Sequence, residues 1–120
     1  MKSHWVEHQG KRVFIADFSG FGDDSNAVQK ECDEIVAELK KEPLKSVLSI
    51  SNATGTNANV HTVRVLKRIL AASNPFINKR ATVGVKGGRR FILAVFNEVA
   101  SVPLEPFDTM LQALDWIVKD

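Results

Sequence analysis

The chain has 120 residues, the size of one domain, which suffices to bury a core without disulfide bonds or a structural metal. Its 16 basic and 14 acidic residues give a formal net charge of +2, which is too balanced to indicate a nucleic-acid-binding protein. The single cysteine, Cys32, excludes an internal disulfide framework and a cysteine-based zinc site. No apolar run reaches the about 20 residues of a membrane-spanning helix, and no signal-peptide core is visible, so we expect a cytoplasmic protein.

The chain is predicted to begin with a pair of short strands. Gln9 and Gly10 form a turn signal between two strand-like stretches within residues 3–18. Alternation in the second stretch gives it two largely apolar faces. One face carries Val13, Ile15 and Asp17, and the other carries Phe14, Ala16 and Phe18.

Residues 26–42 are predicted to form the first helix. Asp23, Asp24 and Ser25 are candidates for its N-cap, and Pro43 ends it. Its apolar residues follow helical spacing, at Val28, Cys32, Ile35, Val36 and Leu39. We therefore expect Cys32 to be a buried structural cysteine.

A strand is predicted at 46–51, followed by a polar loop at 52–59. The second helix is expected to begin near Asn59 and to stop at Asn74 and Pro75. Its predicted apolar stripe consists of Val63, Leu66, Ile69 and Leu70.

The last third of the chain predicts two more strands and two more helices. Residues 80–86 form a strand, and 88–100 form a helix that is apolar nearly all round and hence well buried. The two prolines within 102–107 suit a short edge strand. Asp108 is expected to cap a final helix, whose apolar face is predicted to be Met110, Leu111, Leu114, Ile117 and Val118. The order ββαβαβαβα predicts an α/β sandwich in a single domain over 1–120.

The glycine turn VGVKGGRRF joins a predicted strand to a predicted helix and has two interpretations. Free backbone N–H groups at the helix start, with nearby cations, would bind an anion, which makes candidates of Lys86, Gly87, Gly88, Arg89 and Arg90. Alternatively, the glycines only allow a sharp turn into a buried helix. The second interpretation is favoured, because neither a Walker A sequence nor a G-x-G-x-x-G sequence is present.

The polar loop before the second helix is the other candidate binding segment. Its side-chain donors and acceptors could bind a partner or an anion, and the candidates are Asn52, Thr54, Thr56, Asn57 and Asn59. Asparagine and threonine are also ordinary turn and cap formers, so a structural role is the favoured alternative.

No catalytic set of residues is recognisable in the sequence. The histidines His4, His8 and His61 are not joined by a carboxylate cluster, so no metal site is expected. No nucleophile, base and orienting group can be named together, and we expect neither an enzyme nor a cofactor.

Positive charge gathers late in the chain, at Lys79, Arg80, Lys86, Arg89 and Arg90. This excess could meet an anionic membrane surface or an acidic protein, or it could be a solvated rim. Phe18, Phe21 and Phe76 lie at the edges of predicted elements, where they would form a contact patch if exposed. Burial is the expected state for most of them.

Several landmarks occur together in one order. They are W-x-x-x-x-G-K-R-V at 5–13, A-D-F-S-G at 16–20, SVLSIS at 46–51, T-G-T at 54–56, A-T-V-G-V-K-G at 81–87 and L-D-W-I at 114–117. On these motifs the chain resembles the SpoIIAA-like family of small bacterial proteins. That family belongs to the STAS superfamily and shares its fold with CRAL-TRIO lipid-exchange domains.

The resemblance implies a superhelical β/α arrangement, with a mixed sheet of four to five strands and about four helices mostly on one face. It implies a non-enzymatic regulatory module that binds a protein partner, with a homodimer as one form. Its alternative implication is a carrier or sensor of a small apolar or amphipathic ligand, peripheral at a membrane surface. The phosphorylated serine of anti-sigma-factor antagonists falls near Ala58, and Asn57 stands in place of the motif aspartate, so no phosphoswitch is expected.

Overall fold

The computed structural model describes residues 1–56, 59–85 and 91–119, and within them it contains one five-stranded sheet. The strands lie in chain order, β1-β2-β3-β4-β5. β1 is antiparallel to β2, and the remaining neighbours are parallel. The strand bounds are His4–His8 for β1, Lys11–Asp17 for β2, Val47–Asn52 for β3, Ile77–Val83 for β4 and Leu104–Phe107 for β5.

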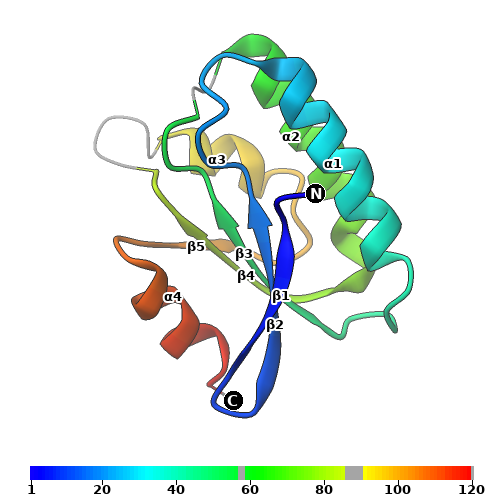
Figure 1. Ribbon diagram of the computed structural model, residues 1–120, viewed down its shortest axis with the longest axis vertical. Coiled ribbons are helices and arrows are strands. Elements are labelled where there is room, and N and C mark those ends of the chain that lie inside the picture. Colours follow the sequence, from blue (N-terminus) through cyan, green and yellow to red (C-terminus); the bar gives the residue numbers. More distant parts are fainter. Residues whose placement is uncertain (57–58, 86–90, 120) are drawn as a thin grey trace.

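Four α-helices occur in the described residues, and they cover the sheet unequally. Their bounds are Ser25–Leu39 for α1, Val60–Ser73 for α2, Phe91–Asn97 for α3 and Met110–Ile117 for α4. Figure 1 shows α1, α2 and α3 on one side of the sheet and α4 on the other. Sequential parallel strands joined by crossovers of one hand place all their helices on the same face. The predicted order ββαβαβαβα and the mixed sheet are confirmed.

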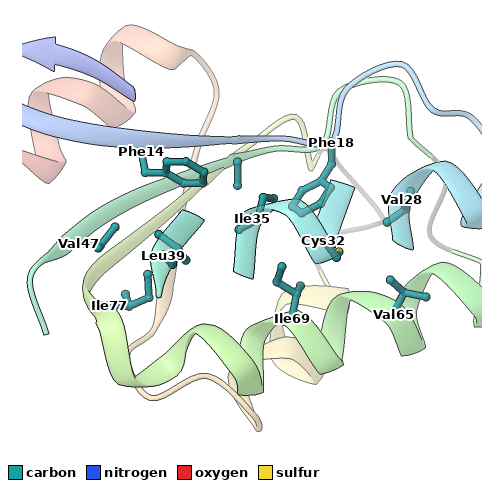
Figure 2. Packing of buried hydrophobic residues seen from close by; sticks show 11 residues of the cluster. Phe14, Phe18, Val28, Cys32, Ile35, Leu39, Val47, Val65, Ile69 and Ile77 are labelled. Atoms are coloured by element: carbon teal, nitrogen blue, oxygen red, sulfur yellow. The ribbon is translucent and has the colours of Figure 1, made fainter. Parts of the chain in front are cut away.

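The two faces of β2 build two separate cores, as its alternation predicted. Phe14, Ala16 and Phe18 pack with α1 and α2 (Figure 2). Val13 and Ile15 face the opposite way, into a cluster with α4. β2 is therefore buried on both faces, against α1 and α2 on one side and against α4 on the other.

Helix α1 is the element that the sequence predicted most completely. Asp24 is its N-cap, and the carboxylate accepts a hydrogen bond from Ala27 N at 3.0 Å. The predicted apolar face is buried at Val28, Cys32, Ile35 and Leu39, and Val36 is partly buried. Glu31 is also buried on this helix, which the pattern did not predict.

The predicted boundaries of β4 and α3 were partly wrong. β4 begins at Ile77 instead of residue 80, because the helix-stopping pair Asn74 and Pro75 forms a single 3-10 turn, Asn74–Phe76, that leads directly into the strand. α3, described over Phe91–Asn97, ends at Asn97 instead of residue 100, and it is not buried all round; its predicted start at residue 88 lies outside the described residues. Ile92, Leu93 and Phe96 are buried, whereas Ala94 and Asn97 are exposed.

The start of α4 also differs from the prediction. Its N-cap is Thr109 rather than Asp108, because Thr109 and Gln112 form a reciprocal capping box. Leu111 is 62% exposed, whereas Ala113 is fully buried. On a helix that packs through Met110 and Ile117, position 113 lies on the packed face and position 111 does not. No helix of the described segments is long and apolar enough to span a membrane.

Replacing Thr109 with alanine is expected to lower the free energy of unfolding by about 1 kcal/mol, because it removes the capping box. Urea unfolding of the purified protein measures the change. Thr109→Ser keeps a hydroxyl acceptor at the cap and should unfold at nearly the wild-type midpoint. Equal losses in the two variants would mean that the methyl group, and not the cap, stabilises the helix.

Candidate ligand-binding site

Loops that follow β2 and β3 stack on each other at the carboxyl edge of the sheet. Phe18 N donates to Asn52 O at 2.8 Å, and Gly20 N donates to Thr54 O at 2.8 Å. Gly22 N then donates to Gly55 O at 3.0 Å. The parallel pairing of the two strands therefore continues beyond their ends into these loops, and the stack forms one end of the space beneath the helices.

The predicted loop residues mostly hold this stack together. Asn52 Oδ1 accepts from Thr54 N at 3.1 Å, and Asn59 caps α2 by accepting from Thr62 N at 2.9 Å. Thr56 Oγ1 donates to Phe18 O and accepts from Phe21 N at 3.1 Å. These contacts give Asn52, Thr56 and Asn59 the structural roles that were the favoured alternative.

The remaining candidates divide into one exposed residue and several outside the described segments. Thr54 is exposed, and its backbone groups take part in the loop stack. Asn57, Lys86, Gly87, Gly88, Arg89 and Arg90 lie outside the described residues. Anion binding by VGVKGGRRF therefore stays a prediction.

The structure explains why this turn requires glycine at position 84. The φ of Gly84 is +92°, a backbone conformation that residues other than glycine rarely adopt. A Cβ placed on Gly84 would lie 2.5 Å from both Thr54 N and Thr54 Oγ1. The end of β4 thus packs backbone to backbone against the loop after β3.

A cavity of about 100 Å³ lies between the sheet and the three helices α1, α2 and α3. Its floor is polar and is formed by β3 and β4, in which Ser49 is in register with Arg80 and Ser51 is in register with Thr82. Its walls are apolar side chains from all three helices, including Ile35, Leu39, Leu66, Ile69, Ile92 and Phe96.

Small side chains on the two central strands explain why the space exists. Parallel strands covered by helices usually carry near-continuous valine, isoleucine and leucine. Here Ser49 and Thr82 are buried on the helix-facing side, while Ile50 and Ala81 of the same strands face α4. Serine leaves unfilled the volume that a large aliphatic side chain would occupy.

Arg80 is the one charged side chain of the described residues that lines the cavity, and it is only 5% exposed. Its Nη2 donates to Leu70 O at 3.3 Å, Ser73 Oγ at 3.0 Å and Asn74 Oδ1 at 2.9 Å, at the carboxyl end of α2. Its Nε has no hydrogen-bond partner among the described residues. Burial lowers the pKa of Arg80 to about 10, so the guanidinium still carries its charge at neutral pH.

Thr62 is a second unpaired polar group in the cavity, near the other end of α2. Its side chain is 1% exposed, and Oγ1 has no hydrogen-bond partner in the described segments. Two unpaired buried polar atoms in one cavity are unusual, since native interiors satisfy nearly all such groups.

The prediction that Arg80 belongs to a surface cluster of positive charge was wrong. Arg80 is buried inside the protein rather than exposed. Lys79, its neighbour, lies over the Trp116 ring with Nζ 4.2 Å from the centroid, and donates to Trp116 O at 3.1 Å. Phe18 is buried, and Phe21 and Phe76 pack against the helix-side core, so these three side chains do not form the exposed contact patch.

Asp17 and His8 are titratable side chains that lie at opposite ends of the β1–β2 pair, each with partners of its own. Burial would by itself raise the pKa of Asp17, but hydrogen bonds from Ser19 and the charge of Lys2 lower it below its ordinary value. His8 Nε2 lies 2.8 Å from Asp115 Oδ1, on the side of α4. No group of three metal-ligating side chains occurs in the part of the chain that the structure describes.

Cys32 has the structural role that the sequence predicted. It is buried in the helix-side core. Burial, together with the nearby charges of Asp33 and Glu31, raises its pKa to about 12, which keeps the thiol protonated at neutral pH.

Comparison with known proteins did not identify a family for this chain. No protein-family model matches the chain, and a search of curated proteins found no match.

Proposed function

We propose that the protein binds a small amphipathic ligand in the cavity beneath α1, α2 and α3, and acts as a carrier or sensor without catalysing a reaction. The observation that supports this proposal is the cavity itself, with apolar walls and a polar floor of Ser49, Ser51, Arg80 and Thr82. Ligand sites are typically concave and mostly apolar, with a few placed polar groups that orient the ligand. The shared fold of SpoIIAA-like proteins and lipid-exchange domains, which the sequence resemblance invokes, favours the same function.

Polar residues on the cavity floor weigh against a purely structural explanation. Small hydroxyl side chains at the centre of a parallel sheet forfeit the packing energy of aliphatic ones. A sequence under selection for stability alone gains from filling such a space. A ligand that contacts these polar groups would explain why the sequence keeps both the cavity and the hydroxyl side chains.

Binding of a protein partner, including a second copy of this chain, remains a second proposal. Val60, Arg64 and Arg68 are exposed and lie one turn apart along the outer side of α2. An apolar residue followed by two cations suits an acidic protein or an anionic membrane surface. A carrier needs such a contact in order to deliver its ligand, so the two proposals are compatible.

The test of the cavity is a variant that fills it. Ser49→Leu places an aliphatic side chain on the cavity floor, and it is expected to weaken 1-octanol and octanoate binding at least tenfold while the melting temperature stays level or rises. Isothermal titration calorimetry measures binding, and Ser101→Leu makes the same exchange at an exposed position as the control. Absence of saturable binding of both probes to the wild type, with no small molecule released in native mass spectrometry, would overturn the proposal.

A further inference from the structure

We propose that the ligand carries a carboxylate, and that Arg80 is the residue that anchors it. This inference rests on the proposed function, because it assigns the chemistry of a ligand held in the same cavity. It is carried by a buried, charged guanidinium with unused donors that lines an apolar space.

The donors of Arg80 are only partly used by the protein. Its three hydrogen bonds to described residues all leave from Nη2. Arginine has five N–H donors in a planar fork, so Nε and Nη1 remain to bind an acceptor. Both parallel donor pairs of a guanidinium include Nη2, so a carboxylate would accept a single charge-assisted hydrogen bond from Nε or from Nη1. Such a bond to an ionised acceptor is stronger than one to a hydroxyl or a neutral carbonyl.

The charge of Arg80 is not balanced within the described segments. Burial is the one cause behind its lowered pKa, so no nearby carboxylate offsets the burial. Buried cations are ordinarily paired with an anion, because removing a lone charge from water is costly. The neutral partners Leu70 O, Ser73 and Asn74 provide dipoles but no opposite charge. An anionic group on the ligand supplies the negative charge that would pair with Arg80.

The shape of the site indicates where the rest of the ligand lies. Arg80 contacts Ser73 in the last turn of α2, and Thr62 lies in its first turn. Three helical turns separate these two residues, a distance of roughly 16 Å. Leu66 and Ile69 line the cavity between them. A ligand with its carboxylate at Arg80 therefore extends an apolar chain along α2 toward Thr62.

The competing explanation is that Arg80 only caps the carboxyl end of α2, where a cation is favourable. Its partners do not depend on it. Leu70 O also accepts from Asn74 N, and Asn74 Oδ1 accepts from Ser101 N at 2.9 Å. Ser73 Oγ donates to Ile69 O at 2.7 Å. Arg80→Met, which keeps the volume and removes the charge, is therefore expected to leave the melting temperature unchanged or to raise it.

The decisive experiment compares an acid with its alcohol. Octanoate and 1-octanol are titrated by calorimetry into the wild type, Arg80→Met and Arg80→Lys. We expect the wild type to bind octanoate roughly tenfold or more tightly than 1-octanol. Arg80→Met should lose that preference and keep its affinity for the alcohol, and Arg80→Lys should retain part of the preference.

A second measurement on the wild type covers the case in which Arg80→Met fails to fold. Octanoate should shift the Arg80 Nε–H resonance, assigned by its loss in Arg80→Lys, and 1-octanol should not. Equal affinity for acid and alcohol, or an Nε–H resonance that octanoate leaves in place, would overturn the anchor and leave the proposed function standing. Failure of both probes to bind, with no small molecule released in native mass spectrometry, would instead overturn the proposed function.

Discussion

Replacing Gly84 with alanine is expected to lower the free energy of unfolding by about 3 kcal/mol. Two costs add at this position. The backbone φ of +92° is strained for any residue with a Cβ. The new methyl group would also lie 2.5 Å from Thr54 N, so the end of β4 and the loop after β3 must separate. The backbone of Thr54 cannot rotate away as a flexible side chain would.

Gly10 provides the matched control for this substitution. Its φ is +79°, and a Cβ there would meet nothing within 4 Å. Gly10→Ala should therefore show the conformational cost alone, about 1 kcal/mol. Urea unfolding of both variants isolates the steric part as their difference. Equal losses would show that the close approach of Gly84 to Thr54 does not constrain the native protein.

The Gly84→Ala substitution should also change the cavity. Gly84, Ala53 and Thr56 line it, and Ala53 and Thr56 belong to the same loop as Thr54, which the new methyl group would displace. We expect Gly84→Ala to weaken 1-octanol binding, whereas Gly10→Ala, on the hairpin that joins β1 and β2, should leave binding unchanged.

The sequence predicted an element well where its cap, its apolar spacing and its terminating residue all indicated the same structure. Helix α1 has a capping aspartate, four buried apolar positions at helical spacing and a proline after its end, and all of these point to the same helix. The start of α4 was predicted wrongly because Asp108 and Thr109 are both good caps. The Gln112 side chain, which completes the capping box, decides in favour of Thr109.

The site was less predictable because strand pairing creates it. Ser49 and Ser51 are unremarkable in a strand until β3 is known to lie between β2 and β4, covered by helices. The alternation of serine with Leu48 and Ile50 was a usable signal, since a central parallel strand is normally apolar on both faces. Arg80 was assigned to a surface cluster because its neighbours in sequence are basic. Only the register with Ser49 places it inside.

Glu31 is another buried charge, and it has a different role, because the chain itself provides its partners. The carboxylate accepts from Lys2 N at 3.1 Å and from Ser3 N at 2.8 Å, which fixes the segment leading into β1 against α1. Burial alone would raise the pKa of Glu31, but hydrogen bonds from the Ser3 hydroxyl and backbone and from Lys2 N outweigh it, and the pKa is lowered. Glu31 is thus stabilised as an anion in the folded protein.

A lowered pKa sets the direction of the pH dependence. A carboxyl group whose pKa is depressed by folding contributes stability above its unfolded pKa of about 4.3, and the contribution is lost as pH falls through the folded value. Glu31→Gln is expected to lose about 2 kcal/mol of unfolding free energy at pH 7, because the amide leaves one buried N–H without an acceptor. The difference from the wild type should shrink as pH falls below 4.

Glu34 offers a control on the same helix. It pairs with the N-terminal ammonium at 3.1 Å, but its side chain is 36% exposed, so Glu34→Gln should lose less than about 1 kcal/mol. Urea unfolding of both variants and the wild type at pH 7, 5 and 3 separates the two acids. A Glu31→Gln deficit that is the same at all three pH values would show that the two acceptor oxygens of the side chain, and not its charge, hold Lys2 and Ser3 in place. A deficit that falls with pH ties the first strand to an ionised carboxylate, and the fold then contains two buried charges of opposite kind. The charge of Glu31 is satisfied by the chain, whereas no opposite charge faces that of Arg80 within the described segments, where we propose that the ligand binds.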